Sequence, residues 1–228
     1  MLLGAAALAA IVVTVSVIVA GGASKGTSPP GKGQAAAGVA KTNALFASVP
    51  QSGTTLGNPK APASLVVFAD LQCPFCRQYD LGVVPTLVQR YVRTGKLSLE
   101  LREIALIGPD SLKAATWAAA AAQQNRLYQF ADLFYRNQGM ENSGYVTDSF
   151  LSKMARGAGM NVAQARRYAS SPSLRQRLAA TTNAAQNAGV DGTPTFFVGR
   201  GKSLRPLSVG GYDPQSFSAA LDSALGSG

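Results

Sequence analysis

Two cysteines, Cys73 and Cys76, are the only ones in the chain and form a Cys-Pro-Phe-Cys tetrad. The run before them, residues 65–70 (LVVFAD), is short, apolar and rich in β-branched side chains, which predicts a buried strand. Pro74 suits the first turn of a helix. Such a strand-to-helix junction places the first sulfur beside unpaired backbone N–H groups at the positive end of the helix. We therefore expect Cys73 to ionise and attack, and Cys76 to be the resolving thiol that releases the mixed disulfide.

The helix N-terminus sets how reactive Cys73 is expected to be. An unperturbed thiol, with a pKa of about 8.5, is only a few per cent ionised at pH 7. A helix N-terminus contributes up to about 1–2 kcal/mol, which lowers that pKa by about one unit. Two other interpretations stay open: an inert structural disulfide, and half of a metal site for which a dimer would supply four thiolates.

The composition excludes several classes of enzyme. None of the 228 residues is a histidine. Ser-His-Asp and Cys-His nucleophile systems need an imidazole, and a closed structural zinc site usually needs four Cys or His ligands. Haem proteins with histidine axial ligands are excluded as well. We expect no metal, and no cofactor other than a redox-active Cys73-Cys76 disulfide.

The net charge of +10 is concentrated in one segment. Between Ser149 and Val190 there is no acidic residue, and the cations are Lys153, Arg156, Arg166, Arg167, Arg175 and Arg177. This pattern predicts a basic helical face, either simply solvated or docked on anionic lipid headgroups. Nucleic acid is not expected as a partner, because no aromatic residues interleave with the cations and no binding motif is present.

The first forty residues predict export and tethering. Residues 1–20 carry no charge, and a helix of this length matches a hydrocarbon core of roughly 30 Å, so we expect a transmembrane anchor or uncleaved signal. Cleavage near residues 20–23 is the alternative, although the cationic start of a secretory signal is absent. Residues 21–41, rich in Gly, Ser, Pro, Ala and Lys, predict a flexible linker.

The side of the membrane follows from redox chemistry. Lys25, Lys32 and Lys41 follow the apolar segment. Under the positive-inside rule they would favour an orientation with the chain after the segment in the cytoplasm. Disulfides, however, form and persist in oxidising compartments. We give this second argument more weight and expect a single-pass cell-membrane protein with its catalytic domain, residues 42–228, on the extracytoplasmic side.

The remaining pattern alternates strands and helices. After CPFC we predict a helix over 74–93, kinked near Pro85, and then a strand over 97–106. Residues 109–189 predict helices without a strand. Strand character returns in 193–199 and in the stretch through 207–210, and Asp213 is expected to cap a helix that starts at Pro214.

At this point the sequence resembles a known family. The runs GNPKAP, LVVFADLQCPFC and GVDGTPTFFVG, at residues 57–62, 65–76 and 189–199, resemble the DsbA-like thioredoxin-fold oxidoreductases of bacterial envelopes. The likeness covers residues 54–226. It implies an α/β thioredoxin fold, a central mixed sheet flanked by helices, with an inserted all-helical subdomain at about 109–189 and a preceding N-terminal transmembrane helix.

The resemblance also implies roles for individual residues. Pro74 and Phe75 form the active-site motif with the two cysteines. Thr193 and Pro194 would form a cis-proline turn that faces the cysteines, where the Thr193 backbone pairs with substrate and Pro194 keeps the nearby sulfur free of metal. From the residues alone, an ordinary turn at a strand start is the simpler interpretation of Pro194, and only the resemblance carries the inference of a cis bond.

Two positions depart from the family's pattern. Phe75 stands where strongly oxidising members often carry a histidine, so it offers no charge to the thiolate. Val67 stands where many members have a buried carboxylate that helps proton transfer. Asp70 is either a substitute proton acceptor for the resolving thiol or a solvated strand-end residue.

Arg77 is the nearest cation that could compensate for the missing histidine charge. It lies four residues after Cys73 on the same helical face, so it either lends charge to the thiolate or is simply exposed. Together with Phe75 and Val67, these features predict a weaker oxidant than the histidine-bearing members.

The resemblance favours an oxidase that introduces disulfides into reduced exported proteins and is recharged by a membrane quinone-linked redox partner. A reductase or isomerase of the same fold is an alternative, because direction depends on reduction potential. A non-catalytic envelope protein that binds extended peptides is a third possibility.

Overall fold

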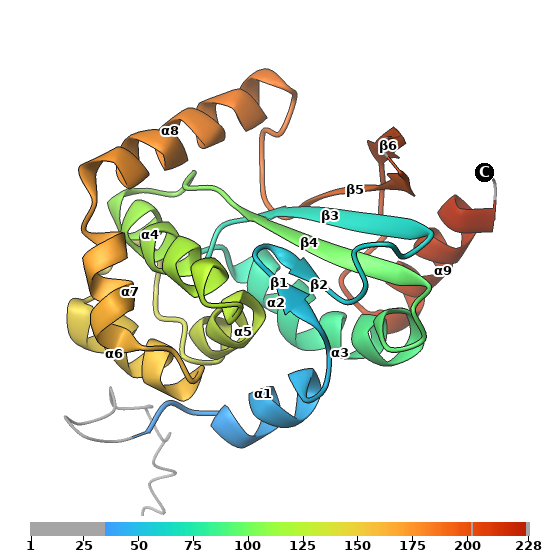
Figure 1. Ribbon diagram of the computed structural model, residues 1–228. Helices are drawn as coiled ribbons and strands as arrows, with labels where there is room; N and C mark the ends of the chain where they lie inside the picture. The colour runs from blue at the N-terminus through green and yellow to red at the C-terminus, as the bar shows by residue number, and fades with distance from the viewer. Residues whose placement is uncertain (1–34, 202, 227–228) are drawn as a thin grey trace, which may run out of the picture. The chain divides into compact units, whose positions relative to one another are not determined.

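A six-stranded mixed sheet organises the part of the chain that the computed structural model describes, residues 35–201 and 203–226 (Figure 1). The strand order is β1-β2-β4-β3-β5-β6, with β3 and β4 parallel and the other neighbours antiparallel. The strands are β1 (Gln51–Ser52), β2 (Thr55–Leu56), β3 (Ala63–Ala69), β4 (Leu97–Glu103), β5 (Thr195–Arg200) and β6 (Ser203–Pro206).

Helices flank this sheet and also pack on one another beside it, at the left of Figure 1. They are α1 (Val39–Phe46), α2 (Pro74–Gly82), α3 (Val84–Leu87), the π-helical turn η1 (Val88–Val92), α4 (Pro109–Gln123), α5 (Leu127–Arg136), α6 (Asp148–Gly157), α7 (Val162–Ala169), α8 (Pro172–Asn187) and α9 (Pro214–Gly226). The expected helical run over 109–189 is confirmed, since it contains α4 to α8 and no strand.

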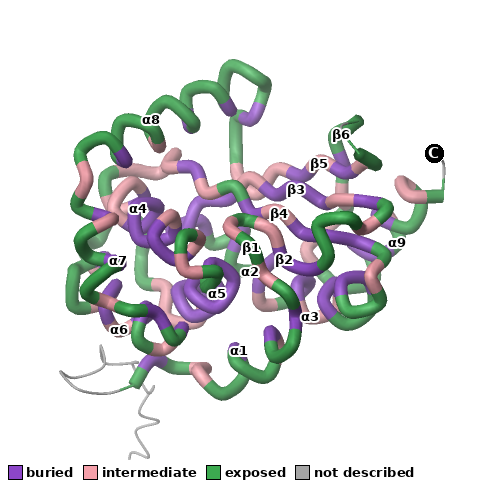
Figure 2. The backbone as a smooth tube through the Cα atoms, in the orientation of Figure 1, coloured by how far each residue is buried: buried purple, intermediate pink, exposed green. Residues whose placement is uncertain are grey.

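The main core lies on one face of the sheet. Alternation along β3 and β4 points Leu65, Val67, Leu99 and Leu101 to the same face, where they join a cluster with residues of α2, α5 and α9. The opposite face has a much smaller cluster, in which Ile104 packs near the end of α8. Figure 2 shows the contrast: the central strands are largely buried, whereas α8 is mostly exposed.

Two expected elements have different boundaries in the structure. The helix over 74–93 is divided into α2, α3 and η1, because Pro85 near the start of α3 has no N–H to continue the α2 ladder. The strand over 97–106 ends at Glu103. Beyond Ile104, whose N–H still donates to Ala69, the N–H of Ala105 donates to the Thr182 hydroxyl at 3.1 Å, and those of Leu106 and Ile107 donate to the Asp70 carboxylate at 2.9 and 3.1 Å instead of to a strand.

The C-terminal hairpin lies earlier than expected. The strand predicted through 207–210 is wrong, because β6 is Ser203–Pro206 and follows β5 through a tight turn in which Gly201 has φ 58°. The prediction for the last helix is confirmed. Asp213 accepts hydrogen bonds from the N–H groups of Gln215 and Ser216, at 3.0 and 2.9 Å, just before α9.

Helix α1 corrects the predicted linker. Residues 39–41 are helical rather than flexible, and Ala36 is already buried. Residues 21–34 of the predicted linker and the predicted anchor at 1–20 lie outside the described residues. Among the residues that are described, no helix is both long and apolar enough to cross a membrane.

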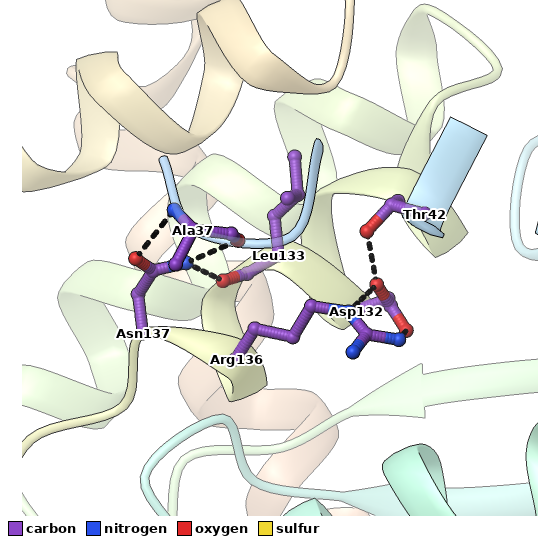
Figure 3. A network of polar contacts seen from close by, with 6 residues as sticks. All are labelled: Ala37, Thr42, Asp132, Leu133, Arg136 and Asn137. Atoms are coloured by element: carbon purple, nitrogen blue, oxygen red, sulfur yellow. Dashed lines mark hydrogen bonds and ion pairs between the residues drawn. The ribbon is translucent and has the colours of Figure 1, made fainter. Parts of the chain in front are cut away.

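Polar contacts join α1 and the residues before it to α5 (Figure 3). The Thr42 hydroxyl donates to the Asp132 carboxylate, which also accepts from Arg136 at 2.7 and 3.0 Å. The side chain of Asn137 exchanges two hydrogen bonds with the backbone of Ala37, at 3.0 and 3.1 Å. The segment before residue 42 is therefore part of the folded body from Ala36 onward.

Candidate active site

The two cysteines occupy the junction between β3 and α2. Cys73 is the N-cap residue of α2, and its N–H donates to the Asp70 carbonyl at 3.0 Å. Pro74 is the first helical residue, as its sequence position predicted. Both cysteines are buried and unpaired, with Cys73 4% and Cys76 1% exposed. The junction thus holds both sulfurs at the positive end of a helix.

Several donors stabilise a thiolate on Cys73. The N–H of Cys76 donates to the Cys73 sulfur at 3.4 Å and stabilises the thiolate. The Thr193 carbonyl lies 3.2 Å from the same sulfur and accepts a hydrogen bond from it only in the thiol form. The hydrogen bond from the Cys76 thiol is the largest cause that lowers the pKa of Cys73 from 9.0 to about 6. Burial opposes it, and further hydrogen bonds with Thr193, Cys76 and Phe75 lower the pKa again.

Cys76 has the opposite electrostatic environment. Burial raises the pKa of its thiol well above 9.0, and the hydrogen bond to Cys73 and the negative charge on Cys73 raise it further. At neutral pH the reduced pair therefore holds a thiolate on Cys73 and a thiol on Cys76. This is the charge distribution that a nucleophile and a resolving thiol require.

The turn before β5 faces the first cysteine. The peptide bond between Thr193 and Pro194 is cis, as the family resemblance implied. The Thr193 carbonyl is the atom that contacts the Cys73 sulfur, although 120 residues separate them in sequence. The sheet brings the two together because β5 pairs with β3, the strand that ends at the tetrad.

Asp70 is buried rather than solvated. It has no exposed surface, and its carboxylate accepts hydrogen bonds from the N–H groups of Gln72, Leu106 and Ile107 at 2.9, 2.9 and 3.1 Å. The expectation of a solvated strand-end residue is wrong, because three backbone donors replace water around the carboxylate. Among the described residues no hydrogen bond joins its carboxylate to Cys76, so its role as proton acceptor stays a prediction.

Phe75 and Arg77 both point away from the core. Phe75 is 53% exposed and its ring lies 6.3 Å from that of Tyr212, centroid to centroid. Arg77 is exposed, and within the described range no hydrogen bond or ion pair links it to Cys73. An influence of Arg77 on the thiolate stays a prediction.

Two glutamines support the tetrad and were not found from the sequence. Gln138 donates to the carbonyls of Leu71 and Cys73 at 2.8 and 3.1 Å. Gln72 donates through its side chain to Ser111 and Asn142 at 2.9 and 3.2 Å. Sequence patterns give no signal for such contacts, since the partners lie between 39 and 70 residues apart.

The described residues contain no group of three or more His, Cys, Asp or Glu side chains that could hold a metal ion.

Comparisons with known proteins point to one family. The family model described as Thioredoxin matches residues 50–222. A probable disulfide bond formation protein D from Bacillus anthracis is 30% identical over 189 residues, covering 81% of this chain and 83% of the relative. A protein with the same description from Bacillus cereus is 29% identical with the same coverage.

Solved structures agree with these relatives. A thioredoxin-like oxidoreductase from Silicibacter pomeroyi is 29% identical with a TM-score of 0.57, and the match covers 81% of this chain and 97% of the other. BdbD from Bacillus subtilis has a TM-score of 0.65 at 16% identity, over 78% of this chain and 97% of the other. The second match concerns the fold alone.

Proposed function

Because this chain belongs to the thioredoxin family and is a DsbA-like thiol-disulfide oxidoreductase, we propose that Cys73 and Cys76 are its redox-active pair and that it introduces disulfides into exported proteins. The observation that carries the proposal is the opposite ionisation of the two buried sulfurs. The pKa of Cys73 is lowered to about 6, whereas that of Cys76 is raised well above 9.0.

The proposed cycle starts from the Cys73-Cys76 disulfide. A substrate thiolate attacks the Cys73 sulfur, the disulfide breaks, and Cys76 leaves and takes up a proton. A second substrate thiolate then attacks the substrate sulfur of the mixed disulfide, so the substrate is oxidised and Cys73 leaves as a thiolate. A leaving thiol with a low pKa leaves faster, which favours Cys73 in this role.

The lowered pKa of Cys73 also supports the oxidising direction. Stabilising the thiolate stabilises the reduced enzyme, and a stabilised reduced form makes a stronger oxidant. Phe75 provides no charge to that thiolate, so we expect a milder oxidant than histidine-bearing relatives. No cofactor beyond the cysteine pair is needed for the exchange itself.

Substrate binding is proposed at the turn opposite the tetrad. There the Thr193 backbone would pair with an extended substrate segment, and Pro194 would keep metal away from the sulfur. Phe75 within the tetrad is 53% exposed, and Met140, two residues after the Gln138 that donates to the Cys73 carbonyl, is 78% exposed, so both offer apolar side chains to a substrate. Reduced, unfolded chains expose the apolar side chains that such a surface accepts.

We place the reaction on the extracytoplasmic side of the cell membrane, with residues 1–20 as the tether and a membrane redox partner that reoxidises the pair. Two related proteins are described as probable disulfide bond formation proteins. Disulfides persist in oxidising compartments, which supports this location.

Two variants test the exchange itself. The full chain is oxidised and mixed with a reduced peptide that contains two cysteines and a fluorophore-quencher pair. Cys73→Ser should abolish peptide oxidation, whereas Cys76→Ser, activated as a Cys73 mixed disulfide with glutathione, should pass the disulfide on but be unable to form its own internal disulfide. Peptide oxidation that survives Cys73→Ser would exclude the assigned nucleophile.

The reduction potential tests the direction. After equilibration in glutathione buffers, an oxidase should show a potential between about −120 and −200 mV, whereas a value near −270 mV, that of thioredoxin, would assign the chain as a reductase. The rate of Cys73 alkylation should follow a thiolate with a pKa of about 6.

A further inference from the structure

Helix α2 carries a buried carboxyl one turn beyond the resolving cysteine. Asp80 follows Cys76 by four residues and is only 6% exposed. Side chains at positions i and i+4 share one helical face, about 5–6 Å apart at Cβ, and lean toward the helix N-terminus. Asp80 therefore leans back toward Cys76.

One oxygen of this carboxyl is left without a partner. Asp80 Oδ2 is buried, and no described residue donates a hydrogen bond to it. An unpaired buried carboxylate is costly, and such groups commonly shift their pKa and become neutral. Burial and the charge of Asp132 raise the pKa of Asp80, while Arg136 opposes the shift. Asp80 can thus hold a proton under conditions where an ordinary aspartate cannot.

The titratable groups around Asp80 lie on α2, α5 and β4. They are Cys76 and Tyr79 on α2, Tyr128, Asp132, Tyr135 and Arg136 on α5, and Glu103 on β4. Arg136 is the one cation among them, and both of its hydrogen bonds go to Asp132. No cation in this set is therefore left to pair with Asp80.

Strand β3 contains no acidic residue that could accept the Cys76 proton. The position six residues before Cys73 is Val67, which is buried in the main core. Glu103 is an acid on the same sheet face. It lies on the neighbouring strand opposite Ala69, and both of its carboxylate oxygens are buried without a partner. Glu103 is therefore the matched comparison for Asp80: a second unpaired acid on a strand rather than on the helix of the cysteines.

We propose that Asp80 carries the proton that Cys76 gains and loses during disulfide exchange. The inference rests on the proposed function, in which Cys76 is the resolving thiol. When the pair is reoxidised, Cys73 is first joined to the oxidising partner in a mixed disulfide. The Cys76 proton then passes to the Asp80 carboxylate, the Cys76 thiolate attacks the Cys73 sulfur, and the partner's sulfur leaves with the electron pair of the broken bond.

The reverse step returns the same proton. When a substrate thiolate attacks Cys73 in the oxidised enzyme, the S–S bond breaks and its electron pair goes to the Cys76 sulfur. The protonated Asp80 carboxyl then gives its proton to Cys76. Among the described residues no hydrogen bond joins the Asp80 carboxyl to the Cys76 sulfur. Proton transfer between them therefore requires a rotation of the Asp80 side chain or a relaying water.

Ellman's reagent reports the reactions of Cys73 and Cys76 as two successive kinetic phases. With the reduced full chain and excess reagent in a stopped-flow instrument, Cys73 releases one thionitrobenzoate and is left as a mixed disulfide. Attack by Cys76 releases a second in a phase whose rate does not depend on reagent concentration. Asp80→Asn should leave the first phase unchanged and slow the second roughly a hundredfold at pH 7, as expected on loss of a positioned acid or base.

The pH profile distinguishes proton transfer from a merely structural effect. In Asp80→Asn the second phase should rise about tenfold per pH unit, because solvent hydroxide then removes the proton, whereas the profile of the unmodified chain should be flatter. Asp80→Glu, which keeps a carboxyl, should restore most of the rate. Glu103→Gln should leave the rate near that of the unmodified chain.

The outcomes separate the two proposals. If the unmodified chain shows no second phase, Cys76 does not resolve the mixed disulfide and the proposed function itself fails. If the second phase is present and Asp80→Asn leaves its rate and pH profile unchanged, the role of Asp80 is overturned. That role is overturned as well if Glu103→Gln, and not Asp80→Asn, produces the slow and steeply pH-dependent phase.

Discussion

Buried carboxyls occur in two neighbouring regions of this protein and are treated in opposite ways. At the junction of α1 and α5, Asp132 has no exposed surface and accepts hydrogen bonds from Thr42 and from Arg136 (Figure 3). Beside the tetrad, Glu103 has two buried oxygens without a partner and Asp80 has one. We call the first region compensated, because the Asp132 carboxylate has an arginine and a hydroxyl as partners. We call the second region uncompensated, because the buried oxygens of Glu103 and Asp80 have no partner among the described residues.

The difference separates a structural carboxyl from a reactive one. A carboxylate held by a guanidinium and a hydroxyl fixes two helices relative to each other. An unpaired buried carboxyl has a raised pKa, because burial disfavours its charged form, so it holds a proton at a higher pH than an ordinary carboxyl. Perturbed groups of this kind gather at functional sites, and here one of them, Asp80, lies one helical turn after Cys76 on α2.

The largest expected effect comes from breaking the compensated region. Arg136→Met keeps an apolar stem but leaves Asp132 buried without its cation, and removing one partner of a buried pair costs about 3–5 kcal/mol. Urea denaturation should show this loss in the free energy of unfolding. Arg77→Met, which removes an exposed arginine on α2, should change it by less than about 0.5 kcal/mol. Equal losses in both variants would mean that the Asp132 pair is not structural.

A smaller loss should follow from removing the second donor to the same carboxylate. Thr42→Val is close in shape and deletes the hydroxyl that bonds Asp132. Hydrogen bonds to charged groups contribute about 1.5–3 kcal/mol, so we expect a loss of about 2 kcal/mol in the free energy of unfolding. Combining Thr42→Val with Arg136→Met should give less than the sum of the two losses, because both act on one carboxylate. Strict additivity would contradict a shared network.

The same contrast shows what the sequence could predict. The strand expected at 65–70, the helical run expected at 109–189 and the N-cap Asp213 follow local patterns, and the structure has β3 at Ala63–Ala69, the helices α4 to α8 and the Asp213 cap in these places. The strand β6 was misplaced because all four of its residues are exposed, so no apolar alternation marks it. The two-residue strands β1 and β2 are too short to show a period.

For the candidate site, the sequence predicted the residues that stand in short motifs. It did not predict the residues whose role depends on contacts with distant parts of the chain. The tetrad and the Thr193-Pro194 turn stand in recognisable motifs. The burial of Asp70 depends on backbone donors 36 and 37 residues away, and Asp80 and Glu103 are acids at positions that a linear pattern assigns to solvent. Only the packed structure shows that they lack partners.

The smallest and most specific effect is expected in the uncompensated region. There the substitution should raise the free energy of unfolding instead of lowering it. Burial, followed by the charges of Asp70 and Asp80, raises the pKa of Glu103 well above 4.5 in the folded protein. A raised folded-state pKa means that the folded chain binds the proton more tightly than the unfolded chain. The associated stability is complete below pH 4.5 and is lost as the pH rises through the folded-state value.

Glu103→Gln removes this loss because glutamine does not titrate. The variant should therefore unfold at nearly the same urea concentration as the unmodified chain near pH 4, and should become more stable than it, by about 1 kcal/mol, at pH 7. Urea titrations at several pH values would measure the difference directly. A stability difference that does not change with pH would mean that Glu103 is compensated like Asp132, and the contrast between the two regions would then reduce to Asp80 alone.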